Sequence, residues 1–170
     1  MNMKIFSRQQ PTFEALTDGD YVFQNEIGGG RRVYLIGSNR QYWDQYLSRG
    51  IRYGYEVIRK GLPCHLYIDL DVNKVKWPNM KVIEIWQTLE KHIDFVFINQ
   101  FRVPVDDIEK NIQFSSNSQK GSMHIIYKIK GKMFKNNAHV GAFMRCVHAF
   151  ISVHDPDTSV IFEEKFVDMA

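Results

Sequence analysis

Residues 65–71 constrain the fold more than any other stretch of the chain. They read HLYIDLD, an alternation of aliphatic side chains with aromatic or acidic ones. In a β-strand, successive side chains point to opposite faces of the sheet. The three aliphatic residues are therefore expected on a buried face, with Asp69 and Asp71 together on the other. This pattern predicts a sheet that packs on one side and presents two carboxylates on the other.

Asp69 and Asp71 form the first constellation that could carry chemistry. Carboxylates two residues apart in a strand lie about 7 Å from each other, and their repulsion makes joint ionisation costly in a partly buried place. A divalent cation removes that cost because hard cations bind carboxylate oxygens, and two cations about 4 Å apart can bridge such a pair. The alternative is a solvated strand end, which the pattern alone does not exclude.

The length and composition fit a single domain with a hydrophobic core. The chain has 170 residues, of which 44% are hydrophobic, and its net charge of +3 permits an anionic partner without requiring one.

Cys64 and Cys146 lack zinc-ligand spacing, so we expect two buried free thiols and no zinc-binding domain. No apolar run reaches about 18 residues and no signal peptide is seen. We expect a soluble intracellular protein without a membrane partner; nucleus, mitochondrion and cytoplasm are not distinguished.

Hydrophobic spacing predicts an α+β architecture that mixes antiparallel hairpins with crossover helices. Strands are expected at residues 20–27, 32–37, 55–58, 65–71, 112–116 and 123–129, with a closing strand pair between 159 and 170. Helices are expected before residue 20, at 39–48 after the cap Ser38, at 79–97 after the cap Asn79, and from Asn136 or Asn137 onward.

A second constellation lies in the segment KGSMH at residues 120–124. If strand geometry begins by residue 120, then Lys120, Ser122 and His124 share one face. Their ammonium, hydroxyl and imidazole groups are donors that suit phosphate oxygens. A solvated edge strand would show the same pattern. The five lysines between 120 and 135 fit either an exposed surface or contacts along a nucleic-acid backbone.

Two further residues are candidates because of their positions. Asp168 ends an apolar stretch near the last residue, and Arg32 follows the three glycines at 28–30. Arg32 could contact a phosphate or could be an exposed hairpin charge. Neither residue indicates a function when taken alone.

Taken together, these segments resemble the PrimPol branch of the archaeo-eukaryotic primase superfamily. The resemblance rests on four stretches in family order: RRVYLIG with the helix after it, YEVIRKGLPCHLYIDLDVN, SSNSQKGSMHIIYKIKGKMFKNNAHVGAFMR and EEKFVDMA. The resemblance as a whole covers residues 4–170, nearly the whole chain. The Ser-x-His strand followed by FKNNAHVGAF is the most specific of these matches.

For the acidic residues, the resemblance implies a two-metal site. Asp69 and Asp71 match the family's first acidic motif, and Asp168 matches the aspartate of its third. The three carboxylates are expected to converge, with Asp168 within about 10 Å of the other two, because the bridging metals lie about 4 Å apart. The ions implied are Mg²⁺ or Mn²⁺.

For the hydrogen-bond donors, the resemblance implies a nucleotide site. Lys120, Ser122 and His124 match the family's second motif, which grips the phosphates of the incoming nucleotide. Arg32 matches an arginine that contacts nucleotide or template. The implied fold is a two-lobed α+β core with an RRM-like sheet, and residues 1–170 would form one catalytic domain.

The implied reaction is template-directed nucleotidyl transfer by a DNA primase-polymerase. A 3′-hydroxyl attacks the α-phosphate of an NTP or dNTP, and pyrophosphate leaves. The implied partners are a DNA template and primer, with a helicase or a single-strand-binding protein in the cell. The isolated domain is expected to be a monomer.

Three departures bear on this interpretation. The first motif is Asp-x-Asp where several eukaryotic members have Asp-x-Glu, which leaves the preferred metal open. The chain stops two residues after Asp168, where the family continues into a basic and aromatic segment, and it lacks the zinc-binding region of some members. We therefore expect a truncated catalytic domain that extends primers poorly by itself. A non-catalytic nucleic-acid-binding fragment and a metal-dependent nuclease stay open as alternatives.

Overall fold

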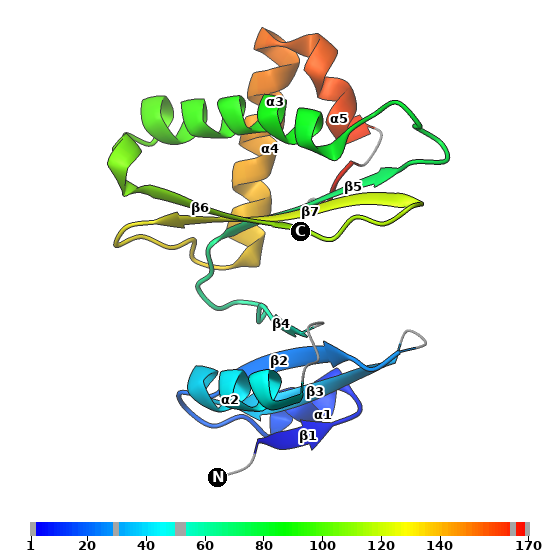
Figure 1. Ribbon diagram of the computed structural model, residues 1–170. Helices are drawn as coiled ribbons and strands as arrows, with labels where there is room; N and C mark the ends of the chain where they lie inside the picture. The colour runs from blue at the N-terminus through cyan, green and yellow to red at the C-terminus, as the bar shows by residue number, and fades with distance from the viewer. Residues whose placement is uncertain (1–2, 29–30, 50–53, 164–165, 169–170) are drawn as a thin grey trace. The chain divides into compact units, whose positions relative to one another are not determined.

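Two antiparallel sheets organise the chain, one in each of the units Met1–Arg59 and Lys60–Ala170 (Figure 1). The computed structural model describes residues 3–28, 31–49, 54–163 and 166–168. Across these residues the protein is mixed α+β with antiparallel sheets flanked by helices, which confirms the predicted class. Within that described part, no helix has the length and apolar character needed to cross a membrane.

The first unit contains a sheet with strand order β1-β3-β2-β4. Its elements are β1 (Lys4–Phe6), α1 (Gln9–Glu14), β2 (Tyr21–Glu26), β3 (Arg32–Gly37), α2 (Asn39–Arg49) and β4 (Gly54–Glu56). The β2–β3 hairpin was predicted, although its glycines at 29 and 30 lie outside the described residues; strand β1 was not predicted. The predicted cap of α2 is confirmed, because Ser38 and Gln41 exchange amide-to-side-chain hydrogen bonds as a capping box.

The second unit contains a sheet with strand order β6-β7-β5-β8. Its strands are β5 (Leu66–Asn73), β6 (Ile108–Phe114), β7 (Lys120–Ile129) and β8 (Val167–Asp168). Its helices are α3 (Val82–Phe95), α4 (Asn137–His154) and the short α5 (Val160–Glu163). Single helical turns lie at Val96–Gln100, Val105–Asp107 and Pro156–Ser159.

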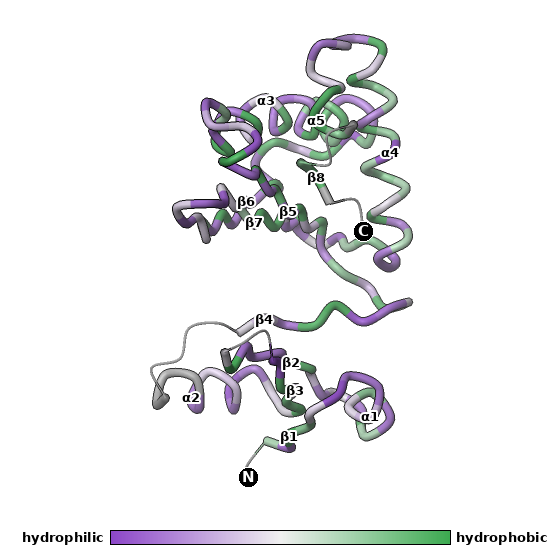
Figure 2. The backbone as a smooth tube through the Cα atoms, turned by 90° about the vertical axis from the view of Figure 1, so that its right-hand side faces the viewer, coloured by the Kyte–Doolittle hydropathy of each residue, from purple (hydrophilic) through white to green (hydrophobic). Residues whose placement is uncertain are grey.

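Alternation along the two central strands decides which face of the second sheet is buried. In β5 the aliphatic side chains are at most 2% exposed: Leu66, Ile68, Leu70 and Val72. In β7 the fully buried side chains are Met123, Ile125 and Tyr127. These residues share one hydrophobic core with α3 and α4, and in Figure 2 much of both strands carries the green of hydrophobic residues. Burial of these apolar side chains therefore determines that the alternate, polar side chains lie on the opposite face of the sheet.

Helix α3 begins later than the sequence predicted. Its N-cap is Lys81 rather than Asn79. The amide of Met80 donates to the carbonyl of Trp77 at 3.2 Å, so the chain completes a turn before the helix starts. The helix start predicted at Asn136 or Asn137 is confirmed, with Asn136 as the side-chain cap of α4.

The predicted closing strand pair is wrong in its first half. Residues 156–163 form helical turns instead of a strand. Pro156 suits the first position of such a turn, and the Asp155 carboxylate accepts a hydrogen bond from the Thr158 hydroxyl at 2.8 Å. Among the described residues after 163, Val167–Asp168 form a strand, β8, which pairs with β5. Both cysteines are free, but Cys146 is exposed rather than buried.

Candidate functional site

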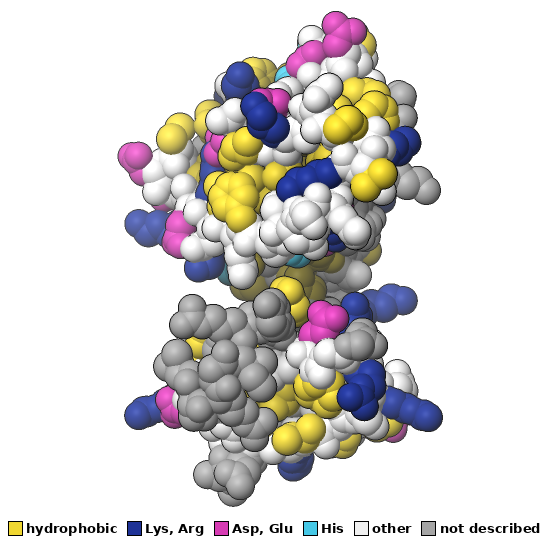
Figure 3. All heavy atoms as spheres, turned by 45° about the vertical axis from the view of Figure 1, so that its right-hand side comes forward, with side chains coloured by type: hydrophobic (Ala, Val, Ile, Leu, Met, Phe, Trp, Pro, Cys, Tyr) yellow, Lys and Arg dark blue, Asp and Glu magenta, His cyan; other side chains and the backbone are white. Residues whose placement is uncertain are grey.

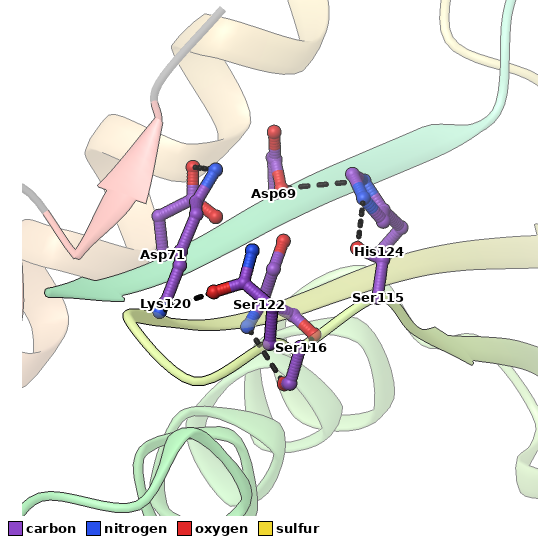
Figure 4. A network of polar contacts seen from close by, with 8 residues as sticks. Asp69, Asp71, Ser115, Ser116, Lys120, Ser122 and His124 are labelled. Atoms are coloured by element: carbon purple, nitrogen blue, oxygen red, sulfur yellow. Dashed lines mark hydrogen bonds and ion pairs between the residues drawn. The ribbon is translucent and has the colours of Figure 1, made fainter. Parts of the chain in front are cut away.

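The predicted polar residues of β5 and β7 lie on the sheet face opposite the core (Figure 4). The antiparallel register places Asp69 opposite His124 and Asp71 opposite Ser122. Directly opposite side chains share a face, with Cβ atoms about 4.5–5.5 Å apart. The predicted division of β7 into a polar and an apolar face is confirmed by this register, and the strand begins at Lys120 as that division requires.

Two contacts between an acidic and a basic side chain connect the strands on this face. Lys120 Nζ lies 2.7 Å from Asp71 Oδ2, and His124 Nδ1 lies 3.2 Å from Asp69 Oδ1. The four side chains are 34% to 49% exposed, so solvent screening weakens each pair. Each carboxylate is therefore matched with a basic group, which offsets the repulsion between the two acids.

Ser115 extends this arrangement, and the sequence analysis did not single it out. Its Oγ lies 3.1 Å from His124 Nε2, so both ring nitrogens of His124 have a polar neighbour. The 3.2 Å contact between Nδ1 and Asp69 Oδ1 is an ion-pair contact rather than a hydrogen bond. Whether Nε2 donates to the Ser115 hydroxyl or accepts from it depends on the tautomer of the ring. The two contacts place the ring of His124 beside Asp69.

The turn between β6 and β7 is held by its own side chains. The amide of Ser122 donates to Ser116 Oγ at 2.9 Å, and the amide of Lys120 donates to Asn117 Oδ1 at 2.8 Å. Ser122 itself is 3% exposed. These bonds keep β7 regular up to its first residue, which positions Lys120 beside Asp71. Paired Ser and Asn residues before a glycine are a turn signal, and that signal could have identified Ser116 and Asn117 from the sequence.

Asp168 lies beside Asp69 in the sheet. The two residues are partners in the β5–β8 ladder, and such partners have Cα atoms about 4.5–5.5 Å apart. The backbone of Asp168 is therefore well inside the predicted distance, while its side chain lies outside the described residues. Among the side chains that are described, no three His, Cys, Asp or Glu residues are grouped to hold a metal ion. The three-acid site stays a prediction.

Asp71 offers an oxygen that fits a cation. Its Oδ1 is buried and has no hydrogen-bond partner within the described part of the chain, whereas its Oδ2 pairs with Lys120. A buried carboxylate oxygen without a partner is costly. A hard divalent cation such as Mg²⁺ or Mn²⁺ would remove this cost, because it prefers carboxylate oxygen ligands.

Arg32 lies in the other unit of the chain from the residues described above. It is exposed at the start of β3 in the first unit, where its backbone partner in β2 is Glu26. Its predicted contact with nucleotide or template stays a prediction.

The lysine-rich stretch after residue 120 is exposed. Lys128 Nζ lies 3.5 Å from Glu109 Oε1, and Lys130, Lys132 and Lys135 are exposed as well. On the side of the molecule drawn in Figure 3, basic side chains are scattered among hydrophobic and neutral ones. Both interpretations of the lysines, a solvated surface and a nucleic-acid contact, agree with this exposure.

Two pockets accompany the sheet of the second unit. One, of about 470 Å³, adjoins the polar face and is lined by residues that include Asp71, Lys120 and Trp77. The other, of about 310 Å³, is apolar and is lined by residues that include Phe97, Phe134 and Phe143. Only the first touches the candidate site.

These features define an α+β protein whose second sheet carries paired carboxylates and basic donors on one face, beside a polar pocket. Comparison with curated proteins finds relatives named DNA-directed primase/polymerase protein. The chain is 32% identical to the one from Bos taurus over 153 residues, 31% to that of Mus musculus over 148 and 30% to that of Homo sapiens over 148. Over the region that they share, the chain is therefore a homologue of DNA-directed primase/polymerase proteins.

The alignments cover most of this chain but only a small part of each relative. Each alignment covers 84% of this chain but only 26% to 28% of the relative. The chain thus spans about a quarter of the length of the proteins it matches. No family model matches it.

Proposed function

We propose that this chain supplies the metal- and nucleotide-binding core of a template-directed DNA primase-polymerase, with the two-lobed catalytic architecture of that family. The observation that carries the proposal is the β5–β7 register, which gathers Asp69, Asp71 and the predicted donors of β7 on one sheet face. The names of the relatives support the same activity. DNA template and primer, and NTP or dNTP, are the proposed substrates.

Asp69, Asp71 and Asp168 would hold Mg²⁺ or Mn²⁺ in this proposal. The bound ions would make a 3′-hydroxyl a better nucleophile and would neutralise charge on the triphosphate. The unpartnered Oδ1 of Asp71 supports an oxygen-liganded cation at this point.

The donors of β7 would bind and orient the triphosphate. Lys120, which pairs with Asp71 in the protein itself, would turn its ammonium to a phosphate oxygen once that carboxylate engages a cation. His124, which lies between Asp69 and Ser115, would donate a ring N–H to a second phosphate oxygen once the Asp69 carboxylate engages a cation. Positioning of this kind supplies most of the rate in phosphoryl transfer.

The reaction itself exchanges a phosphoanhydride bond for a phosphodiester bond. The primer 3′-hydroxyl oxygen forms a bond to the α-phosphorus, and the bond from that phosphorus to the bridging β-phosphate oxygen breaks. Pyrophosphate leaves with the electron pair, and the hydroxyl proton passes to solvent.

Primer extension on a DNA template, with Mg²⁺ and separately with Mn²⁺, tests the proposal. We expect Asp71→Asn to lower the extension rate by about 10²–10³, because a charged group at the reacting phosphate is lost. Asp106→Asn, an exposed acid in the same unit, is the matched control and should extend normally. Shortening of the primer would instead indicate a nuclease. DNA binding without extension under both metals would indicate the non-catalytic binding module.

A further inference from the structure

The pocket beside Asp71 extends past the residues assigned so far. It has a volume of about 470 Å³ and is lined by residues that include Asp71, Asn73, Lys76, Trp77, Gln119 and Lys120. We propose that it is a terminal-phosphate subsite, in which Lys76 acts with Lys120 to bind the outermost phosphate of a nucleoside triphosphate. This inference rests on the proposed function, since it assigns a place to one end of the same substrate.

The donors of β7 form a row that leads to this pocket. His124, Ser122 and Lys120 stand opposite Asp69, Asp71 and Asn73 in turn. Each step of two residues advances about 6.6 Å along a strand, so Lys120 lies about that far past Ser122. A phosphate chain whose first phosphate lies beside Asp71, and which runs this single step along the row, reaches the pocket with its last phosphate.

An aromatic ring holds Lys76 at the wall of the pocket. Its Nζ lies 4.9 Å from the centre of the Trp77 ring, a cation–π contact. An ammonium above a ring still has N–H groups on its far side that can donate to an anion. Trp77 is itself fixed, by an edge-on contact with Phe166 at 5.8 Å and by its amide donating to the Asn73 carbonyl at 2.8 Å. The lysine is therefore positioned before any ligand arrives.

The charge of the pocket suits a phosphate. Its lining includes two lysines and one aspartate, and that aspartate lies 2.7 Å from Lys120. The nearby Lys74 has a structural role, because its Nζ donates to the Asn117 carbonyl at 2.6 Å and so fastens the turn before β7. Charge-assisted bonds from ammonium to phosphate are among the stronger hydrogen bonds in proteins. Lys76 thus adds a second cation where the row of donors ends.

Binding of dATP and of dADP, each with Mg²⁺, measured by isothermal titration calorimetry, tests the subsite. We expect Lys76→Ala to weaken dATP binding about tenfold, the effect of losing a hydrogen bond to a charged group, and to change dADP binding less than twofold. Lys76→Arg should restore most of the preference for dATP. Lys128→Ala is the matched control, because Lys128 is an exposed lysine on the same face at the other end of β7.

The outcomes separate this inference from the function on which it rests. If the unaltered protein prefers dATP and Lys76→Ala retains that preference, the subsite is refuted and the proposed function stands. Equal weakening of both nucleotides also refutes it, since Lys76 would then not act on the last phosphate. If the unaltered protein binds neither nucleotide with Mg²⁺, the proposed function falls and the subsite with it.

Discussion

The core face and the polar face of the β6-β7-β5-β8 sheet are built from the same strands but depend on different interactions. Leu70 is fully buried against the helices, whereas its neighbour Asp71 is 39% exposed and pairs with Lys120. Apolar burial holds the first face, and solvent-screened ion pairs lie on the second. Substitutions on the core face should therefore change stability, and substitutions on the polar face should change ligand binding. This contrast is expected even between neighbouring residues of one strand.

The largest effect is expected from the core face. Leu70→Ala should lower the free energy of unfolding by about 2–5 kcal/mol, because it removes buried methyl groups and leaves a cavity. Urea unfolding followed by tryptophan fluorescence measures this, since Trp86 lies in the same core. Asp106→Ala, an exposed control, should change stability by less than about 0.5 kcal/mol. Similar losses in the two variants would contradict the division between faces.

A substitution on the polar face should change stability appreciably only when a ligand is present. Asp71→Asn should change the free energy of unfolding of the protein alone by less than about 1 kcal/mol, because the lost ion pair is partly exposed. Wild type should gain about 2.7 kcal/mol from Mn²⁺ and dATP at a hundred times their dissociation constant, and the variant should gain little. Thermal melts with and without the ligands measure both quantities. A large loss of stability without ligand would show that the polar face also holds the fold.

Removing the buried hydroxyl of Tyr127, on the core face, should lower stability by an intermediate amount. Tyr127 is fully buried and donates to Asp94 Oδ1 at 3.2 Å. Burial raises the pKa of Tyr127, and the nearby carboxylates of Asp94 and Glu90 raise it further, so the phenol stays protonated as a donor. Tyr127→Phe should cost about 1.5 kcal/mol by chemical denaturation. Tyr21→Phe, at an exposed tyrosine, should cost almost nothing; equal costs would mean that the buried hydrogen bond adds nothing.

The residues predicted correctly are those that strand periodicity controls. Alternation of period two placed Asp69 and Asp71 on one face and the predicted donors of β7 on the same face, because a strand leaves each side chain only two directions. The resemblance to the primase family led us to expect Asp168 near Asp69 and Asp71. The β5–β8 pairing that brings its backbone beside Asp69 was not predicted and does not follow from alternation.

The parts that the sequence did not predict depend on turns and short segments. Ser115 was expected inside the strand at 112–116 but lies just after β6 ends at Phe114, and Trp77 lies outside the expected strands. Their contacts with His124 and Lys76 depend on how two loops close. The start of α3 was misplaced because the turn after Trp77 delays the helix. Residues 159–162 read as a strand because an apolar run this short does not distinguish strand from helix.

The smallest effect is expected among the helices that cover the core face. Asp155 Oδ2 accepts from the Thr158 hydroxyl at 2.8 Å and lies 3.0 Å from His92 Nε2. The hydrogen bond from Thr158 and then that with His92 lower the pKa of Asp155. A carboxyl whose pKa is lowered on folding stabilises the protein above its unfolded value of about 3.9, and this stabilisation is lost as pH falls through the lower folded value.

Asp155→Asn should therefore lower the melting temperature slightly at pH 7, and its difference from wild type should shrink as the pH is taken below about 4. Differential scanning calorimetry at several pH values measures the gap, with Asp106→Asn as an exposed acid at which no such trend is expected. The effect should be far below that of Leu70→Ala, because the Asp155 side chain is 37% exposed and solvent screens its partners. A gap that widened toward acid would show that the Asp155 carboxylate is less stable in the folded protein than in the unfolded chain.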